Sequence, residues 1–235
     1  TKNLPSVDII PSEHFNTVLY TGNATARSIT GVGFQPDFVW LKGRSFADFH
    51  TMYDVVRGAT KSLSSNMTTA EVTRTNSLTG FLSDGFSLGN DGVSNNNGNT
   101  LVSWNWKAGG AAVSNSNGSI TSSVSANPSA GFSIATYTAG DSDETIGHGL
   151  SIAPEVVIVK RRDNATGNWV SFWTPLTSTN KQLYLNLNNA VDTPNLGTFN
   201  ATTFRVNAWA DVAVSGSSYV AYCFHSVDGY SKVGS

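Results

Sequence analysis

The chain repeats itself once, and this internal repeat constrains the fold more than any single residue does. Phe15–Thr21 returns as Phe132–Thr138, and Pro36–Arg44 returns as Pro154–Arg162 at a nearly constant offset. Later matches keep the same spacing: Phe81 with Phe199, Phe86 with Phe204, and Thr100–Trp106 with Ser218–Phe224. A repeat of this length predicts two duplicated domains rather than the thin units of a solenoid.

Composition excludes several classes of protein. The formal net charge of −2 gives no electrostatic reason to bind nucleic acid, and only 13% of the residues are charged. The 39% hydrophobic content supplies the apolar area that disordered chains lack. Lone Cys223 excludes an intrachain disulfide and a multi-cysteine zinc site. No apolar run approaches the roughly 18 residues of a membrane-spanning helix, so we expect no membrane partner.

Short runs of β-branched and aromatic residues alternate with clusters of Gly, Asn, Ser and Asp, which is typical of an all-β protein. Six strands are expected in each copy. They are 17–21, 38–42, 49–55, 61–65, 85–88 and 100–107 in the first, and 134–138, 156–160, 169–174, 181–185, 203–206 and 218–225 in the second. We therefore predict two tandem β-sandwich, jelly-roll-like modules related by internal duplication; the alternative is one merged, lectin-like sandwich.

The repeat also sets the expected domain boundaries. Residues 1–14 form an N-terminal segment, 15–110 the first sandwich and 131–235 the second. Residues 111–130, rich in Ser, Asn and Ala, are either a linker or an edge hairpin. Residues 229–235 repeat the opening of the second copy, which indicates a strand that closes the second sandwich or the first strand of a third copy.

Two strand patterns recur in both copies. Phe38–Leu41 and its counterpart Val156–Val159 are apolar on both faces of the strand, so each strand should be central and covered on both sides. The charged pairs that follow them, Lys42 with Arg44 and Lys160 with Arg162, are interpreted as strand-end charges that keep a hydrophobic strand soluble, with a ligand role as the alternative.

The last strand of each copy places its large side chains on one face. Val102, Trp104 and Trp106 alternate with Ser103 and Asn105, and the second copy matches them with Val220, Tyr222 and Phe224. Aromatic residues at matched positions favour a core, because aromatic side chains contribute mainly through buried area. An exposed platform that stacks on sugars is the alternative.

Several long motifs resemble a module repeated in structural proteins of marine bacteriophages. The motifs of the first copy are GFQPDFVWLKGRS from Gly33, FLSDGFSLG from Phe81 and GNTLVSWNWKAGG from Gly98; the second copy is similar from Ile146 to Asp163 and from Ser217 to Ser231. The resemblance implies a non-enzymatic part of a tail fibre, spike or capsid-associated fibre, located in the virion. The implied partners are other virion proteins and copies of the chain itself, with a trimer as a plausible assembly.

Residues with catalytic or metal-binding chemistry are sparse, and no cofactor is expected. His50 and Asp54 lie four apart, too far along a strand to share a zinc ion. Asp141, Asp143 and Glu144 cluster in one loop and are weak candidates for a hard cation such as calcium, against the simpler reading of a solvated hairpin tip. No pair of carboxylates is singled out for glycoside hydrolysis, so a glycan-degrading spike is the least favoured function.

A carbohydrate-binding module for adsorption to host surface glycans is the alternative function. It would use exposed aromatic rings for stacking and loop amides or carboxylates to bond hydroxyl groups. The expected sugar contacts are Trp169, Trp209, Asp211 and Asn96.

Overall fold

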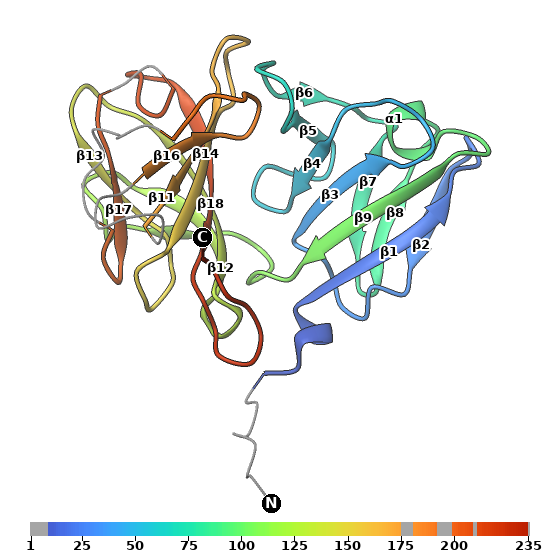
Figure 1. Ribbon diagram of the computed structural model, residues 1–235, viewed down its shortest axis with the longest axis horizontal. Helices are drawn as coiled ribbons and strands as arrows, with labels where there is room; N and C mark the ends of the chain where they lie inside the picture. Colours follow the sequence, from blue (N-terminus) through green and yellow to red (C-terminus); the bar gives the residue numbers. More distant parts are fainter. Residues whose placement is uncertain (1–8, 175–180, 192–198, 209–210, 235) are drawn as a thin grey trace, which may run out of the picture.

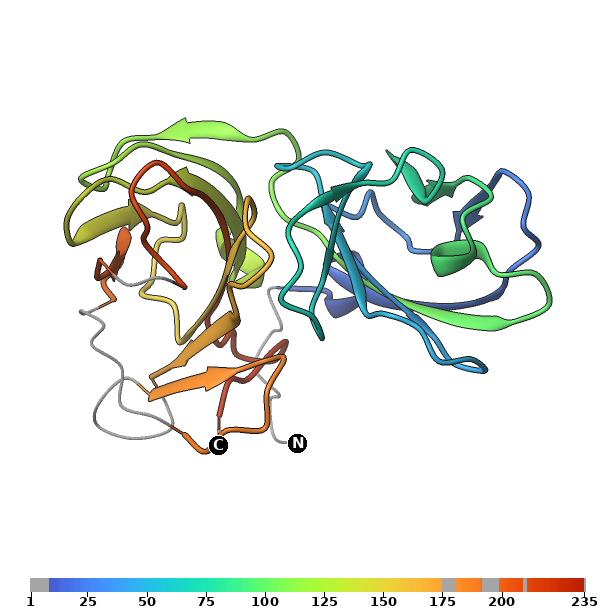
Figure 2. The ribbon, with the colours of Figure 1, turned by 90° about the horizontal axis from the view of Figure 1, so that it is seen from above.

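The computed structural model describes residues 9–174, 181–191, 199–208 and 211–234. The chain folds as an all-β protein of packed antiparallel sheets, as predicted. Figures 1 and 2 show two sandwiches side by side, residues 9–110 in blue to green and the later residues in yellow-green to red. No helix within the described ranges is long and apolar enough to cross a membrane.

The first half contains a large sheet and a small sheet. The large sheet has six strands in the order β1-β9-β3-β4-β5-β6, and the small one has the order β2-β8-β7. The strands are β1 (Phe15–Thr21), β2 (Arg27–Thr30), β3 (Phe38–Gly43), β4 (Thr51–Asp54), β5 (Lys61–Ser64), β6 (Val72–Thr73), β7 (Leu78–Leu82), β8 (Gly85–Leu88) and β9 (Thr100–Trp106). A 3-10 helix, η1 (Pro11–Glu13), precedes β1, and one helical turn, α1 (Gly92–Asn95), precedes β9.

The second half has the same two-sheet construction. Its large sheet has the order β10-β11-β12-β18-β14-β15-β16, and its small sheet pairs β13 with β17. The strands are β10 (Val113–Asn115), β11 (Ser122–Asn127), β12 (Phe132–Thr138), β13 (Glu144–Gly147), β14 (Val156–Arg161), β15 (Trp169–Trp173), β16 (Lys181–Tyr184), β17 (Thr203–Val206) and β18 (Ser218–Phe224). The 3-10 helix η2 (Pro128–Ala130) precedes β12 as η1 precedes β1.

The two large sheets share one strand order. The series β1-β9-β3-β4-β5 corresponds to β12-β18-β14-β15-β16, and β2-β8 corresponds to β13-β17. The registers agree as well, because Trp40 faces Trp104 across β3 and β9 as Ile158 faces Tyr222 across β14 and β18. Descent of the halves from one duplicated ancestor stays a prediction, but equivalent positions can be compared directly.

The segment between the repeats belongs to the second sandwich. Strands β10 and β11 pair with each other and extend the edge of the second sheet beyond β12. Residues 228–230 form a turn, and Ser231 makes only an isolated bridge with Val227. The strand expected to close the second sandwich is therefore absent from the described residues.

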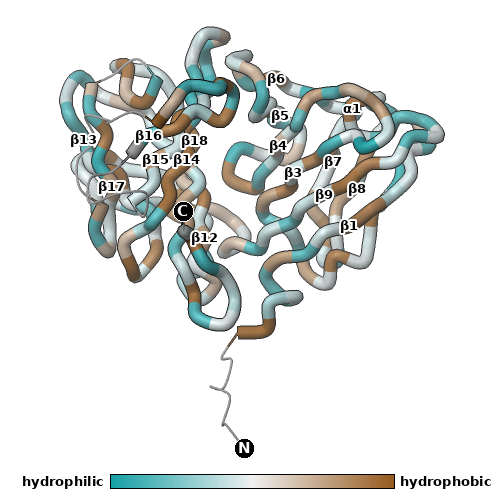
Figure 3. The backbone as a smooth tube through the Cα atoms, viewed as in Figure 1, coloured by the Kyte–Doolittle hydropathy of each residue, from teal (hydrophilic) through white to brown (hydrophobic). Residues whose placement is uncertain are grey.

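Each half has its own core, and a third core joins them. In β3, Val39 and Leu41 point into the first sandwich, whereas Phe38 and Trp40 point towards the second half. Hydrophobic segments in Figure 3 follow the strands of both halves. Every named sheet is built from strands of one half only, so the described part of the chain forms two sandwiches that pack on each other. The third core is Phe38, Met52, Leu63 and Ala108 from the first half and Phe132, Ile134, Trp169, Val220 and Tyr222 from the second.

Candidate functional site

The junction between the two sandwiches centres on Tyr222. This residue is fully buried and lies on the face of β18 that points away from the core of its own half. Its ring stacks on Phe38 of the first half with a centroid distance of 4.5 Å, and Trp169 lies on it at 6.4 Å. The predicted aromatic core of the last strand is therefore confirmed for Tyr222, but that core lies between the halves.

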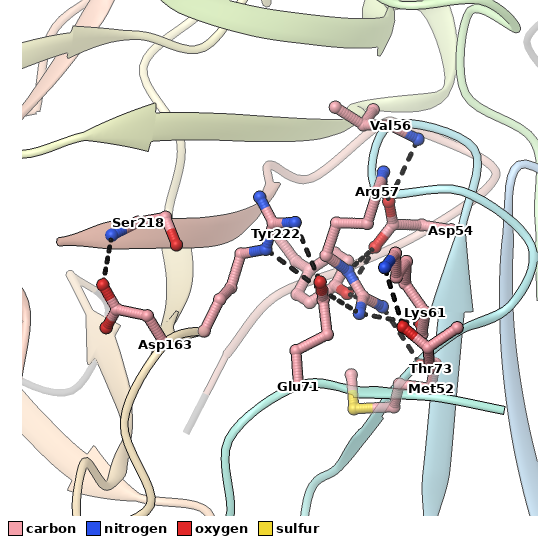
Figure 4. Close-up of polar contacts among 11 residues, drawn as sticks. Met52, Asp54, Val56, Arg57, Lys61, Glu71, Thr73, Asp163, Ser218 and Tyr222 are labelled. Atoms are coloured by element: carbon pink, nitrogen blue, oxygen red, sulfur yellow. Dashed lines mark hydrogen bonds and ion pairs between the residues drawn. The ribbon is translucent and has the colours of Figure 1, made fainter.

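A group of charged residues, here called the junction cluster, surrounds the hydroxyl of Tyr222. It consists of Asp54, Arg57, Glu71, Arg162 and Tyr222, and Figure 4 shows its labelled members converging. The Tyr222 hydroxyl donates to Asp54 Oδ2 at 2.7 Å and accepts from Arg57 Nη2 at 3.2 Å. Arg57 Nε donates to Asp54 Oδ2 at 2.6 Å, and both of these side chains are fully buried.

Glu71 links the two halves through arginines from both. Its Oε2 accepts from Arg57 Nη1 in the first half at 3.0 Å. Arg162 of the second half donates to both Glu71 oxygens at 3.0 Å, a bidentate arrangement that fixes the relative orientation of the two groups. The backbone adds a further link, because the Glu71 N–H donates to the Arg162 carbonyl at 2.8 Å.

The pKa values of Arg57 and Glu71 are shifted towards their ionised forms. Burial by itself would lower the pKa of Arg57, but the nearby Asp54, Tyr222 and Glu71 outweigh it and raise that pKa. Burial by itself would raise the pKa of Glu71, but Arg162 and Arg57 together lower it. Burial raises the pKa of Tyr222 well above its ordinary value, so the phenol stays protonated and can donate to Asp54. The cluster thus joins the two halves through ion pairs and hydrogen bonds.

Lys160 is a second polar link across the junction, and its position corrects a prediction. We expected a solvated strand-end charge, but Lys160 is fully buried. Its ammonium donates to the carbonyl of Thr68 in the first half at 3.0 Å and to that of Gly167 at 2.8 Å. Burial lowers the pKa of Lys160 to about 8. The equivalent Lys42 is half-buried and donates to the neighbouring carbonyl of Gly43.

An apolar pocket of about 380 Å³ lies beside the junction. Most of its wall comes from the second half, and Trp106 contributes from the first. Pockets of this size and character commonly receive a ring or another largely apolar group. The rings and aliphatic groups that form the wall include Trp106, Phe132, Val156, Trp173, Phe224 and Tyr230.

The predicted sugar contacts do not form one platform. Trp169 was expected to be exposed and is fully buried, with its indole N–H donating to the carbonyl of Ser64 at 2.8 Å, so that prediction is wrong. Both carboxylate oxygens of Asp211 accept from Asn168. Asn96 lies just after α1 in the other half, and Trp209 lies outside the described residues.

The weak metal candidates are also not gathered into a site. Asp143 pairs with Arg205 and accepts the Ala208 N–H, whereas Glu144 is buried and accepts the Gly140 N–H at 2.7 Å. Asp141 is exposed. Across the four described ranges, no group of three or more His, Cys, Asp or Glu side chains is arranged to hold a metal ion.

Sequence reasoning missed the junction cluster. Asp54 was considered only with His50 as a zinc pair, and neither Arg57 nor Glu71 recurs in the repeat. One signal was present: in both copies, the last strand carries large side chains on the face opposite its small and polar ones. Such a face needs a partner, and each sandwich has only one core of its own.

The fold and the junction define the class: an all-β protein of two sandwiches held together by an aromatic and charged interface. Over residues 10–235 the chain matches the family described as Domain of unknown function (DUF7483). The chain belongs to this family. Comparisons with curated proteins and with solved structures gave no match.

Proposed function

We propose that the chain is a non-enzymatic structural module of a bacteriophage virion, within a tail fibre, spike or capsid-associated fibre. The observation that carries the proposal is the junction. The two sandwiches pack through a third core, and ion pairs among Arg57, Glu71 and Arg162 connect them. They therefore form one rigid unit rather than two domains joined by a flexible linker. The resemblance of its motifs to modules of marine phage structural proteins supplies the link to a virion.

Stiffness suits an appendage that must transmit position over a distance. A short exposed linker would let the halves reorient, because interdomain motion is expected where the interface is small and polar. Here the contact includes stacked rings and fully buried charges, and breaking it would expose both to water. The proposed partners are other virion proteins and further copies of the chain.

The test is the protein content of purified particles. Mass spectrometry of gradient-purified virions from the phage that encodes the chain should detect it at a fixed copy number relative to the major capsid protein. Immunogold labelling should then place it on an appendage. Its absence from particles, with normal expression in infected cells, would contradict the virion role.

The non-enzymatic part of the proposal has its own test. The protein is incubated with polysaccharide extracted from the host, and newly formed reducing ends are measured. We expect no increase over a heat-inactivated sample. A steady release of reducing ends that depends on folded protein would overturn the structural assignment and favour a glycan-degrading spike.

A further inference from the structure

The equivalence of the halves shows which sheet faces have a partner. The first half covers three residues of the second half: Ile134, Tyr222 and Lys160. Tyr222 and Lys160 also make polar contacts across the junction. The strand registers identify the equivalent positions in the first half as Thr17, Trp104 and Lys42. The same type of face therefore occurs twice in one chain. The second half buries Phe38, Met52 and Leu63 on the face of the first half, but it leaves the equivalent positions Thr17, Lys42 and Trp104 exposed or half-buried.

The uncovered part of the first half's face, here called the open face, consists of Thr17, Lys42 and Trp104, with Trp40 at its border against the third core. Thr17 is exposed, and the other three are half-buried. Trp40 and Trp104 meet edge to face with a centroid distance of 6.2 Å. Leu19, the next residue on that face of β1, is 59% exposed. Large apolar side chains grouped on an accessible face indicate a contact surface.

The first-half side of the junction, which contacts Tyr222, also has a counterpart in the second half. In the first half, Phe38 stacks on Tyr222, and Asp54 accepts its hydroxyl. Phe38 lies opposite both Trp106 and Asp54 in the sheet, and Val156 lies opposite Phe224 and Trp173 in the same way. Val156, Trp173 and Phe224 all line the apolar pocket. The positions of the first half that contact Tyr222, here called the receiving corner, therefore correspond to positions that line the pocket in the second half.

The inserted ring and the residue at the receiving corner differ in polarity between the two halves, and they differ in the same sense. Where the ring is Tyr222, the receiving corner has Asp54, which bonds the hydroxyl. Where the equivalent ring is Trp104, which has no hydroxyl, the receiving corner has Trp173 in place of the aspartate. The Trp173 indole N–H already donates to Ser171 Oγ at 2.6 Å, so its ring is free to offer an apolar surface. The ring of Trp104 brings no hydroxyl that needs a carboxylate, and its indole N–H requires an acceptor or water at the rim of the pocket.

We propose that copies of this chain associate head to tail, with Trp104 of one copy entering the pocket lined by Val156, Trp173 and Phe224 of the next. The contact repeats between chains the geometry that Tyr222 makes within one chain. It joins different surfaces of the two copies, so each complex keeps one open face and one open pocket. Association therefore continues into a filament or closes into a ring. The proposal goes beyond the virion role and does not depend on it.

The experiment uses two single variants of residues 1–235, Trp104→Lys on the open face and Trp173→Lys in the pocket. Light scattering after size exclusion, over a series of concentrations, should show the mass of the wild-type protein rising and each variant staying at the mass of one chain. An equimolar mixture should form a dimer and stop there, because the intact pocket of the first variant meets the intact Trp104 of the second.

Two control variants keep the test specific. Val113→Lys alters an exposed residue of β10 that belongs neither to the open face nor to the lining of the pocket, and it should associate like the wild type. Trp104→Phe keeps a ring and should retain part of the association. Circular dichroism melts establish that every variant is folded before its mass is interpreted.

Three results would overturn the proposal. One is a wild-type mass that stays at one chain at every concentration. Another is a mixture of the two lysine variants that stays monomeric while both are folded. The third is wild-type association that neither variant reduces, which would place the contact elsewhere. If the pocket binds a free sugar while the protein stays at the mass of one chain, the proposal is overturned as by the first result. Because particle content is measured independently, none of these outcomes decides the virion role.

Discussion

Arg57 offers the sharpest test of the junction. All five of its N–H donors have acceptors: Asp54 Oδ2, Glu71 Oε2, the Tyr222 hydroxyl, and the backbone carbonyls of Met52 and Lys61. Arg57→Met keeps an unbranched apolar side chain and removes every donor. Asp54 would retain bonds from Tyr222 and two backbone N–H groups, but it would lose its buried counter-ion.

The expected cost follows from that loss. Removing one partner of a buried ion pair costs about 3–5 kcal/mol, because the remaining charge stays in a poorly hydrated place. Urea unfolding followed by tryptophan fluorescence gives the free energy of unfolding by linear extrapolation. Arg74→Met is the matched control: its ion pair with Asp91 is longer, at 3.4 Å, and its side chain is 30% exposed. That variant should lose at most about 1 kcal/mol.

The outcome that refutes this reasoning is an Arg57→Met protein whose free energy of unfolding is no lower than that of Arg74→Met. The cluster would then contribute nothing to holding the halves together. A large loss with a single transition would show that the halves unfold as one unit. A large loss with two transitions would show that Arg57 couples halves that are each stable alone.

Three further predictions use the same unfolding assay. Tyr222→Ala should cost about 3–5 kcal/mol and Trp104→Ala clearly less, since only Tyr222 is fully buried; equal losses would contradict the difference between the two faces. Between pH 8 and 10.5, the contribution of Lys160 to stability should rise by about 3 kcal/mol, because unfolded Lys160 binds a proton that the folded state has released; it is measured as the difference between the wild type and Lys160→Met, since buried Tyr222 and Cys223, whose pKa values are raised, act in the opposite sense in both proteins. Glu71 has a lowered pKa when folded, so its contribution should be present above pH 4.5 and disappear as the pH falls through the folded pKa; an identical acid transition in Glu71→Gln would exclude it.

The strands themselves could be predicted from local pattern. The expected strands 85–88 and 203–206 coincide with β8 and β17, and the doubly apolar run at Phe38–Leu41 is a central strand covered on both sides. These signals are local, because side-chain alternation depends only on neighbouring residues. Strands with weak apolar patterns, such as β6 and β10, were not recognised for the same reason.

The junction could not be predicted, because it depends on contacts far apart in the chain. Tyr222 and Asp54 bond across 168 positions, and nothing near either residue indicates the other. Lys160 was misread because a lysine at a strand end is usually solvated, and the carbonyl of Thr68 that it meets comes from the other sandwich. Comparison of the repeats identified equivalent positions but not the neighbours that cover them.

The strand order has a consequence for how the chain folds as it is made. In each repeat the last strand lies between the first strand and the third: β9 between β1 and β3, and β18 between β12 and β14. While the chain is being synthesised, β1 and β3 therefore remain without their shared neighbour β9, which is made about eighty residues after β1. During that interval their edges are unpaired and accessible to other chains. A ribosome stalled before residue 100 would hold an incomplete sheet in which β1 is not joined to β3.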